Sequence, residues 1–154
     1  MPNIVHRIST AAATPEEMFE AVSTKSGFAS WWTEKMEGTE GLNGVLKFRF
    51  SEGGPDFQII ELESPEKVTL RCVVGPDEWI GTDLTFDIST EDGETILLFG
   101  HRGWREEIPF MHHCSTQWAY FLLGLKQMFE TGRGLAYGPN YMPISNWASP
   151  TPPS

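Results

Sequence analysis

The sequence predicts an α+β fold in which a curved antiparallel sheet of about six strands surrounds a long C-terminal helix, with two short helices after the first strand. Three observations support this prediction. Short segments of alternating polar and apolar residues follow one another through the middle of the chain, separated by Gly and Pro turns. A strong helix-start signal lies near residue 14. The longest apolar run, residues 118–123, lies within the stretch 110–134.

The helix-start signal combines three residues that favour a helix N-terminus. Thr14 is a good N-cap, Pro15 suits the first helical position, and Glu17 stands at the third, which makes a capping box. We therefore expect a helix from residue 15 to about residue 27. A second short helical turn is expected over residues 28–32.

The strands are predicted by side-chain alternation with a period of two. The turn signal Thr90-Glu91-Asp92-Gly93 marks a hairpin between the last two strands. Short connections imply an antiparallel meander with one face covered, and the C-terminal helix is the obvious cover. The expected strands are residues 3–10, 45–51, 56–63, 67–74, 83–88 and 95–101.

The C-terminal helix is expected over residues 110–131, and Gly132 and Gly134 end it. Residues 1–134 then form a single domain, followed by a Pro-rich extended tail over 135–154. Three apolar side chains predict that the first half of the tail docks on the domain: Tyr141, Met142 and Trp147.

Composition excludes several classes of partner. The net charge of -10 and pI near 4.8 argue against nucleic acid and against an anionic membrane surface. Two cysteines are too few for a disulfide framework, and the N-terminus lacks the apolar segment of a signal peptide. No apolar run is long enough to span a bilayer. A cytoplasmic protein is the resulting expectation.

Three adjacent residues, His112, His113 and Cys114, suggest a metal site at first sight. On a helix they point in three directions: His112 toward solvent, His113 to the flank with Gln117, and Cys114 into the core. Zinc needs ligands that converge at about 2.0–2.3 Å. We therefore predict no metal site, and no cofactor motif is present either.

His101 is the more interesting histidine. If Thr95, Leu97 and Phe99 face the helix, then His101 is a polar group in an apolar space; if Ile96 and Leu98 face inward, it lies at the surface. Alternation leaves both open, because both sets are apolar. The carboxylates of Glu106 and Glu107 lie beside two arginines and are better explained as solvated ion pairs than as acid-base catalysts.

The order of elements resembles the START-like superfamily (SRPBCC, helix-grip fold), of the type related to the activator of heat-shock-protein ATPase. The resemblance covers residues 3–134. Gln117 is a departure, because the family commonly has Gly before the following Trp. The segments that carry the resemblance are TPEEMFEAVSTKSGFASWW, GLNGVLKFRF, LESPEKVTLRCVV, DGETILLFGH and CSTQWAYFLLGLKQMFETGRG.

The chain holds more aromatic residues than a plain core of this size needs, with ten Phe and six Trp. An apolar pocket with a few polar groups would use the excess. We therefore expect a small hydrophobic ligand in a cavity between sheet and C-terminal helix. The expected lining residues are Trp31, Phe48, Phe50, Trp79, Phe99, His101, His113, Gln117, Trp118 and Phe121.

Two other functions stay open. The resemblance implies a co-chaperone-like module in the stress response, with a chaperone as partner. A cyclase or hydratase using His101 or His113 has less support, because no motif fixes a chemistry and no catalytic residue can be assigned. A homodimer is also compatible with the sequence. Its candidate interfaces are an edge strand or the flank of the last helix.

Overall fold

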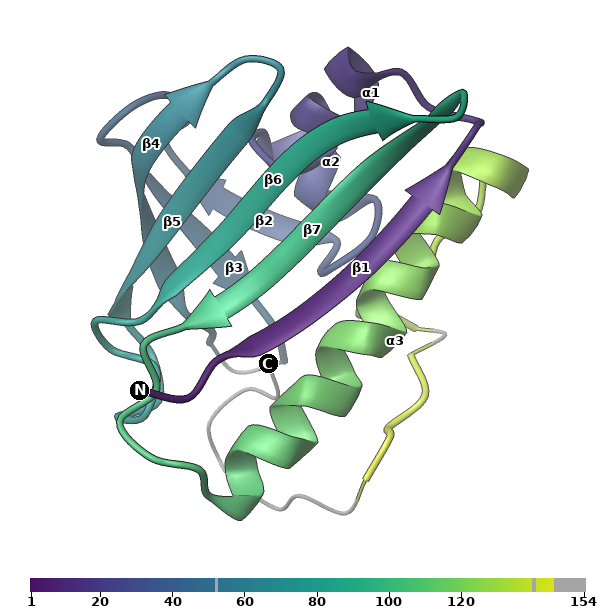
Figure 1. The fold of residues 1–154 in the computed structure, drawn as a ribbon. Helices are drawn as coiled ribbons and strands as arrows, with labels where there is room; N and C mark the ends of the chain where they lie inside the picture. Colours follow the sequence, from purple (N-terminus) through teal and green to yellow (C-terminus); the bar gives the residue numbers. More distant parts are fainter. Residues whose placement is uncertain (52, 140, 146–154) are drawn as a thin grey trace.

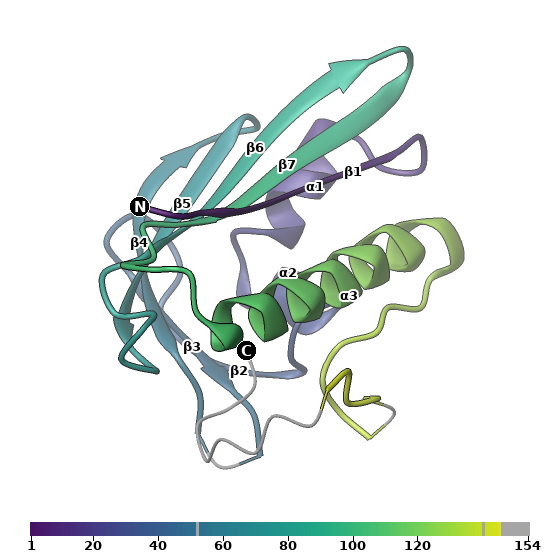
Figure 2. The ribbon, with the colours of Figure 1, turned by 60° about the horizontal axis from the view of Figure 1, so that its bottom comes forward.

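A computed structural model describes residues 1–51, 53–139 and 141–145 of the chain. Seven strands form one antiparallel sheet in the order β1-β7-β6-β5-β4-β3-β2, and the sheet curls around helix α3 (Figures 1 and 2). The elements are β1 Ile4–Thr10, α1 Pro15–Ala21, α2 Lys25–Ala29, β2 Lys35–Gly38, β3 Val45–Arg49, β4 Asp56–Glu63, β5 Lys67–Val74, β6 Asp83–Glu91, β7 Glu94–Arg102 and α3 Pro109–Thr131.

The predicted fold class is confirmed, with one strand more than the six that alternation predicts. The additional strand is β2, which pairs with β3 from Lys35↔Arg49 to Gly38↔Leu46. Its four residues contain a single apolar side chain, Met36, so the strand carries no readable alternation. Pairing with β3, and not local sequence, creates it.

The capping box that opens α1 is present in full. Thr14 Oγ1 accepts from the amide of Glu17 at 3.1 Å, and the Glu17 carboxylate accepts from the amide of Thr14 at 2.8 Å. The helix ends at Ala21, earlier than the expected residue 27. Thr24 interrupts it, because its hydroxyl accepts from the Gly27 amide at 3.0 Å and caps α2 instead.

Helix α3 matches the prediction to within one residue. It begins with Pro109 at its first position, and Gly132 ends it in the left-handed conformation at φ 84°, donating its amide to Met128 O at 2.8 Å. The helix lies against the concave side of the sheet (Figure 2). Its buried face includes Cys114, Trp118 and Phe121, as the helical spacing predicts.

Helix α3 also bonds to the edge strand β1, which runs beside it (Figure 1). His6 Nε2 lies 3.1 Å from Ser115 O, and Lys126 Nζ donates to the backbone oxygen of Ser9 at 2.5 Å. Thr10 Oγ1 donates to the Glu130 carboxylate at 2.9 Å. These bonds lie between His6 and Thr10 of the strand.

The first part of the tail docks, as expected. The Tyr137 amide donates to Trp32 O at 2.7 Å, and the Glu34 amide donates to Tyr137 O at 3.3 Å. Tyr141 packs against α3, whereas Met142 is 61% exposed, so the prediction is confirmed for Tyr141 and wrong for Met142. Trp147 lies outside the described residues.

Removing the N-cap of α1 tests the local analysis. We expect Thr14→Ala to lower the free energy of unfolding by about 1 kcal/mol, because the Glu17 amide at the helix start loses the hydroxyl that accepts its hydrogen bond. Urea denaturation measures the loss. Ser89→Ala, at an exposed position of β6, is the matched control and should change stability by less than about 0.5 kcal/mol. Equal losses would contradict the assignment.

Candidate functional site

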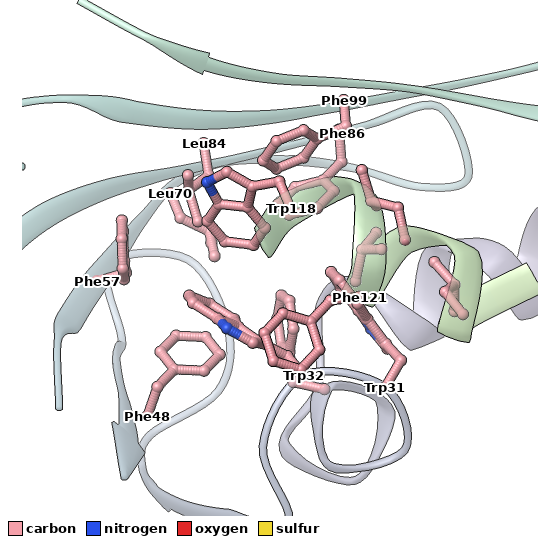
Figure 3. Close-up of a cluster of buried hydrophobic side chains, with 14 of the residues drawn as sticks. Trp31, Trp32, Phe48, Phe57, Leu70, Leu84, Phe86, Phe99, Trp118 and Phe121 are labelled. Atoms are coloured by element: carbon pink, nitrogen blue, oxygen red, sulfur yellow. The ribbon is translucent and has the colours of Figure 1, made fainter. Parts of the chain in front are cut away.

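Buried rings from the sheet, from α3 and from the segments between them pack together in the interior, and we call them the aromatic cluster. Trp118 of α3 lies at its centre, with ring centroids 4.7 Å from Trp32 and 4.7 Å from Phe99. Figure 3 shows this indole between sheet side chains on one side and Trp32 on the other. The members of the cluster are Phe28, Trp31, Trp32, Phe48, Phe57, Trp79, Phe86, Phe99 and Trp118.

All ten expected lining residues are buried, and they come from five different segments of the chain. Trp31, Phe48, Trp79, Phe99, His101, Trp118 and Phe121 have 0% exposure, and Gln117 has 1%. The expected set leaves out five buried rings that lie among these residues or beside them. They are Phe28, Trp32, Phe57, Phe86 and Trp104. Alternation in β6 marks Phe86 as inward-facing, but nothing local distinguishes a ring in the site from a ring in the core.

His101 faces the helix, so the first of the two alternatives holds: Thr95, Leu97 and Phe99 are buried with it, and Leu98 is on the outer face. The Trp118 indole donates to His101 Nδ1 at 3.1 Å. Nδ1 is therefore an acceptor, and Nε2 carries the proton that it donates to Thr82 Oγ1 at 2.8 Å. Thr82 in turn donates to the backbone oxygen of Trp79 at 2.5 Å.

This arrangement fixes the charge of His101. Complete burial lowers the pKa of the imidazole to about 3, so the ring is neutral over the physiological range. Both ring nitrogens are already hydrogen-bonded within the protein. Proton transfer to a bound molecule would require breaking one of these bonds, so the geometry favours a structural or orienting role over general acid-base catalysis.

His112, His113 and Cys114 at the start of α3 point in different directions, as the helical spacing predicts. His112 is exposed and lies 3.3 Å from the Glu107 carboxylate, whereas Cys114 is fully buried. His113 is 8% exposed and hydrogen-bonded to the Ser145 hydroxyl. Burial lowers the pKa of His113 and raises that of the Cys114 thiol. Within the described residues, no group of His, Cys, Asp and Glu side chains is arranged to hold a metal ion.

Gln117 is the polar residue that connects the site to the tail. Its Nε2 donates to the Tyr141 hydroxyl at 2.6 Å, while its Oε1 is buried with no hydrogen-bond partner. Two further buried groups also lack partners, the indole N–H of Trp32 and that of Trp104. Unpaired buried polar atoms are uncommon in folded proteins and mark a place that needs an explanation.

A hollow of about 540 Å³ lies elsewhere on the molecule, at the end of the β6–β7 hairpin. It is lined by residues 11–15, Glu17 and residues 90–95, none of which is an expected lining residue of the ligand cavity. Its lining carries four carboxylates, those of Glu17, Glu91, Asp92 and Glu94. The hollow is open to solvent and has no buried side chain aimed into it without a partner.

The curled antiparallel sheet, the two short helices after the first strand and the long C-terminal helix define a START-like, helix-grip fold. The family described as "Activator of Hsp90 ATPase homolog 1-like protein" matches residues 12–130. The chain belongs to this family. Among curated proteins no sequence matches it. No helix of the described residues is long and apolar enough to cross a membrane.

Solved structures agree with this assignment. The solution structure of the Aha1 dimer from Colwellia psychrerythraea is 39% identical, covers 87% of this chain and 100% of its own, and superposes with a TM-score of 0.80. Protein SSP2350 from Staphylococcus saprophyticus is 15% identical over 88% and 97% of the two chains, with a TM-score of 0.72. CalU16 from Micromonospora echinospora is 19% identical over 84% and 76%, with a TM-score of 0.63. The last two share the fold.

The low pKa of His101 predicts a specific acid sensitivity. The pKa of His101 is about 3 in the folded protein and about 6.5 in the unfolded chain. Between these two pH values only the unfolded chain binds the proton. Stability should fall by about 1.4 kcal/mol per pH unit from this group as the pH decreases through this range.

Denaturant unfolding of wild type and His101→Gln between pH 7 and pH 4 measures this slope. The variant should lack the His101 part of the slope, whatever its stability at pH 7. Leu97→Val, at a buried position on the same strand without a titratable group, is the control and should keep the wild-type slope. An unchanged slope in His101→Gln would show that another group causes the acid sensitivity.

Proposed function

We propose that the protein binds a small hydrophobic molecule between the sheet and α3, at the aromatic cluster. The observation that carries this proposal is the pair of buried polar atoms without partners, Trp32 Nε1 and Gln117 Oε1, beside an otherwise apolar set of rings. Leaving such an atom unpaired costs about 1–3 kcal/mol. A ligand that offers an acceptor to the indole or a donor to the amide would recover part of that cost.

The rest of the site fits an apolar ligand. The rings offer large flat surfaces, and burial of ligand surface contributes about 25 cal/mol per Å². His101 stays neutral, so no buried charge opposes an apolar molecule. The enzyme alternative has less support, because both nitrogens of that imidazole are engaged. A cytoplasmic location agrees with two buried cysteines that are both free.

Titration with the apolar fluorescent probe N-phenyl-1-naphthylamine tests the proposal. We expect saturable binding of one probe per chain, with quenching of Trp emission, because five buried Trp residues surround or adjoin the site: Trp31, Trp32, Trp79, Trp104 and Trp118. Phe121→Leu should weaken binding at least fivefold, since it removes a ring next to Gln117. Leu123→Ala changes an exposed position of the same helix and should leave binding unchanged. Absence of saturable binding would overturn the proposal.

A second candidate function is stimulation of a chaperone ATPase. It is supported by the family description and by the 39% identity to the Aha1 dimer of Colwellia psychrerythraea. The same likeness supports a homodimer of this chain. If the protein stimulates a chaperone ATPase, the aromatic cluster serves only as a rigid core, and the chaperone binds the outer surface of the protein.

The second candidate predicts a measurable rate effect. At saturating concentration the full chain should raise the steady-state ATP hydrolysis rate of an Hsp90-class chaperone at least twofold. Phe121→Leu should stimulate the ATPase as wild type does, because Phe121 is buried and does not contribute to the protein surface. A rate that stays at the chaperone's own value would count against this candidate, and light scattering of the same sample would show whether the chain is a dimer.

A further inference from the structure

The tail forms a strap across the outer side of the aromatic cluster. We define the strap as residues 135–139, 141 and 142, which lie beyond residue 130, where the family match ends. Figure 2 shows this segment running back below α3 toward β2 and β3. Tyr137 forms a parallel bridge with Thr33, and its ring lies 5.0 Å from that of Phe50. The strap therefore connects the far edge of the sheet with α3.

Tyr141 fills a slot at the helix end of the strap. Its ring is stacked on Phe121, with centroids 5.9 Å apart and an interplanar angle of 16°. Tyr120 and Tyr137 lie edge-on or tilted at 6.0 and 4.8 Å. The hydroxyl accepts from Gln117 Nε2. The slot thus recognises a phenol through one stacked ring and one hydrogen bond.

The phenol leaves half of the Gln117 amide unused. An amide side chain offers a donor and an acceptor side by side, and Tyr141 takes only the donor. Gln117 Oε1 is buried without a partner, on a residue that is 1% exposed. An aromatic ring with two neighbouring hydroxyls could accept from Nε2 and donate to Oε1 at once, which a tyrosine cannot do.

We propose that Tyr141 holds the place of a small aromatic ligand with neighbouring hydroxyl groups, and that such a ligand binds by replacing the strap. The ligand recovers a hydrogen bond that the strap leaves unmade, and this difference drives the exchange. This inference rests on the proposed function, because Gln117 and Phe121 belong to the same site. It adds the chemical class of the ligand and its route of access.

Gly124 shows that the strap and the helix are fitted to one another. A Cβ at this position would lie 2.8 Å from Leu135 Cβ and 2.9 Å from Leu135 N. Glycine inside a helix costs about 1 kcal/mol relative to alanine. Gly124→Ala should therefore strengthen α3 and push the strap away, which separates release of the strap from damage to the helix.

Few hydrogen bonds hold the strap in the part of the chain that the structure describes. They are two backbone bonds at Tyr137, to Trp32 and Glu34, and the bond from Gln117 to Tyr141. It follows two glycines, Gly132 in the left-handed conformation and Gly134, whose missing Cβ would lie 2.3 Å from Ser30 O. A segment held by three such bonds can open locally without unfolding the sheet.

The experiment uses the full chain and three probes that differ only in hydroxyl groups: 4-methylcatechol, p-cresol and toluene, all under reducing conditions. Binding is followed by NMR titration, and release of the strap by hydrogen exchange of the Tyr137 amide. We expect affinity to fall from 4-methylcatechol to p-cresol to toluene, with at least tenfold between the first and the last. Bound 4-methylcatechol should speed Tyr137 exchange at least tenfold.

Three variants make the test specific. Gly124→Ala should speed Tyr137 exchange without probe and tighten 4-methylcatechol binding at least fivefold. Gln117→Met should bind all three probes alike, because it removes the amide and keeps the length of the side chain. Leu123→Ala, one residue from Gly124 and exposed, should behave as wild type.

Each other outcome overturns the inference. One is binding of 4-methylcatechol with unchanged Tyr137 exchange, and another is faster exchange in Gly124→Ala with no gain in affinity. Saturable binding of N-phenyl-1-naphthylamine, without a preference among the three small probes, would overturn this inference and leave the proposed function standing. If neither the wild-type protein nor any variant binds any of these molecules, both this inference and the proposed function are overturned.

Discussion

One hydrogen-bonded chain in the core holds the sheet to the C-terminal helix. Trp118 of α3 donates to His101 of β7, His101 donates to Thr82, and Thr82 donates to the Trp79 carbonyl in the connection between β5 and β6. Each link satisfies a polar group that would otherwise be buried alone, so the chain works as a unit. This hydrogen-bonded chain fixes how closely α3 approaches the concave side of the sheet. The positions of Gln117 and Phe121, and therefore of the tail, follow from it.

Local chemistry explains which parts of this fold could be predicted. The capping box at Thr14, the helix over 109–131 and the hairpin at Asp92-Gly93 depend on neighbouring residues, and the prediction was right there. Strand β2 depends on a partner strand, so its own four residues do not reveal it. Alternation leaves the inward face of β7 open, because Ile96 and Leu98 are as apolar as Leu97 and Phe99. Long-range packing decides such cases.

The candidate site was predicted in part. An excess of aromatic residues indicated an interior with more rings than a core needs, and the ten expected lining residues are all buried. What the sequence could not reveal is which polar atoms end without a partner. That property depends on how Gln117 meets Tyr141 across 24 positions of the chain, and no periodicity encodes it. The family assignment by itself identifies a fold that serves several functions.

The attachment of α3 to β1 has a consequence for behaviour at high concentration. An edge strand with free backbone groups is a template on which another chain can add a strand, the first step toward fibrils. Here Lys126 occupies the backbone oxygen of Ser9, and bonds to Ser115 and Glu130 hold the helix alongside the same strand. The opposite edge, β2, is only four residues long. Both edges of the sheet are therefore poor templates for another chain. The helix covers one edge and the strand at the other edge is short, so addition of strands from other molecules is suppressed.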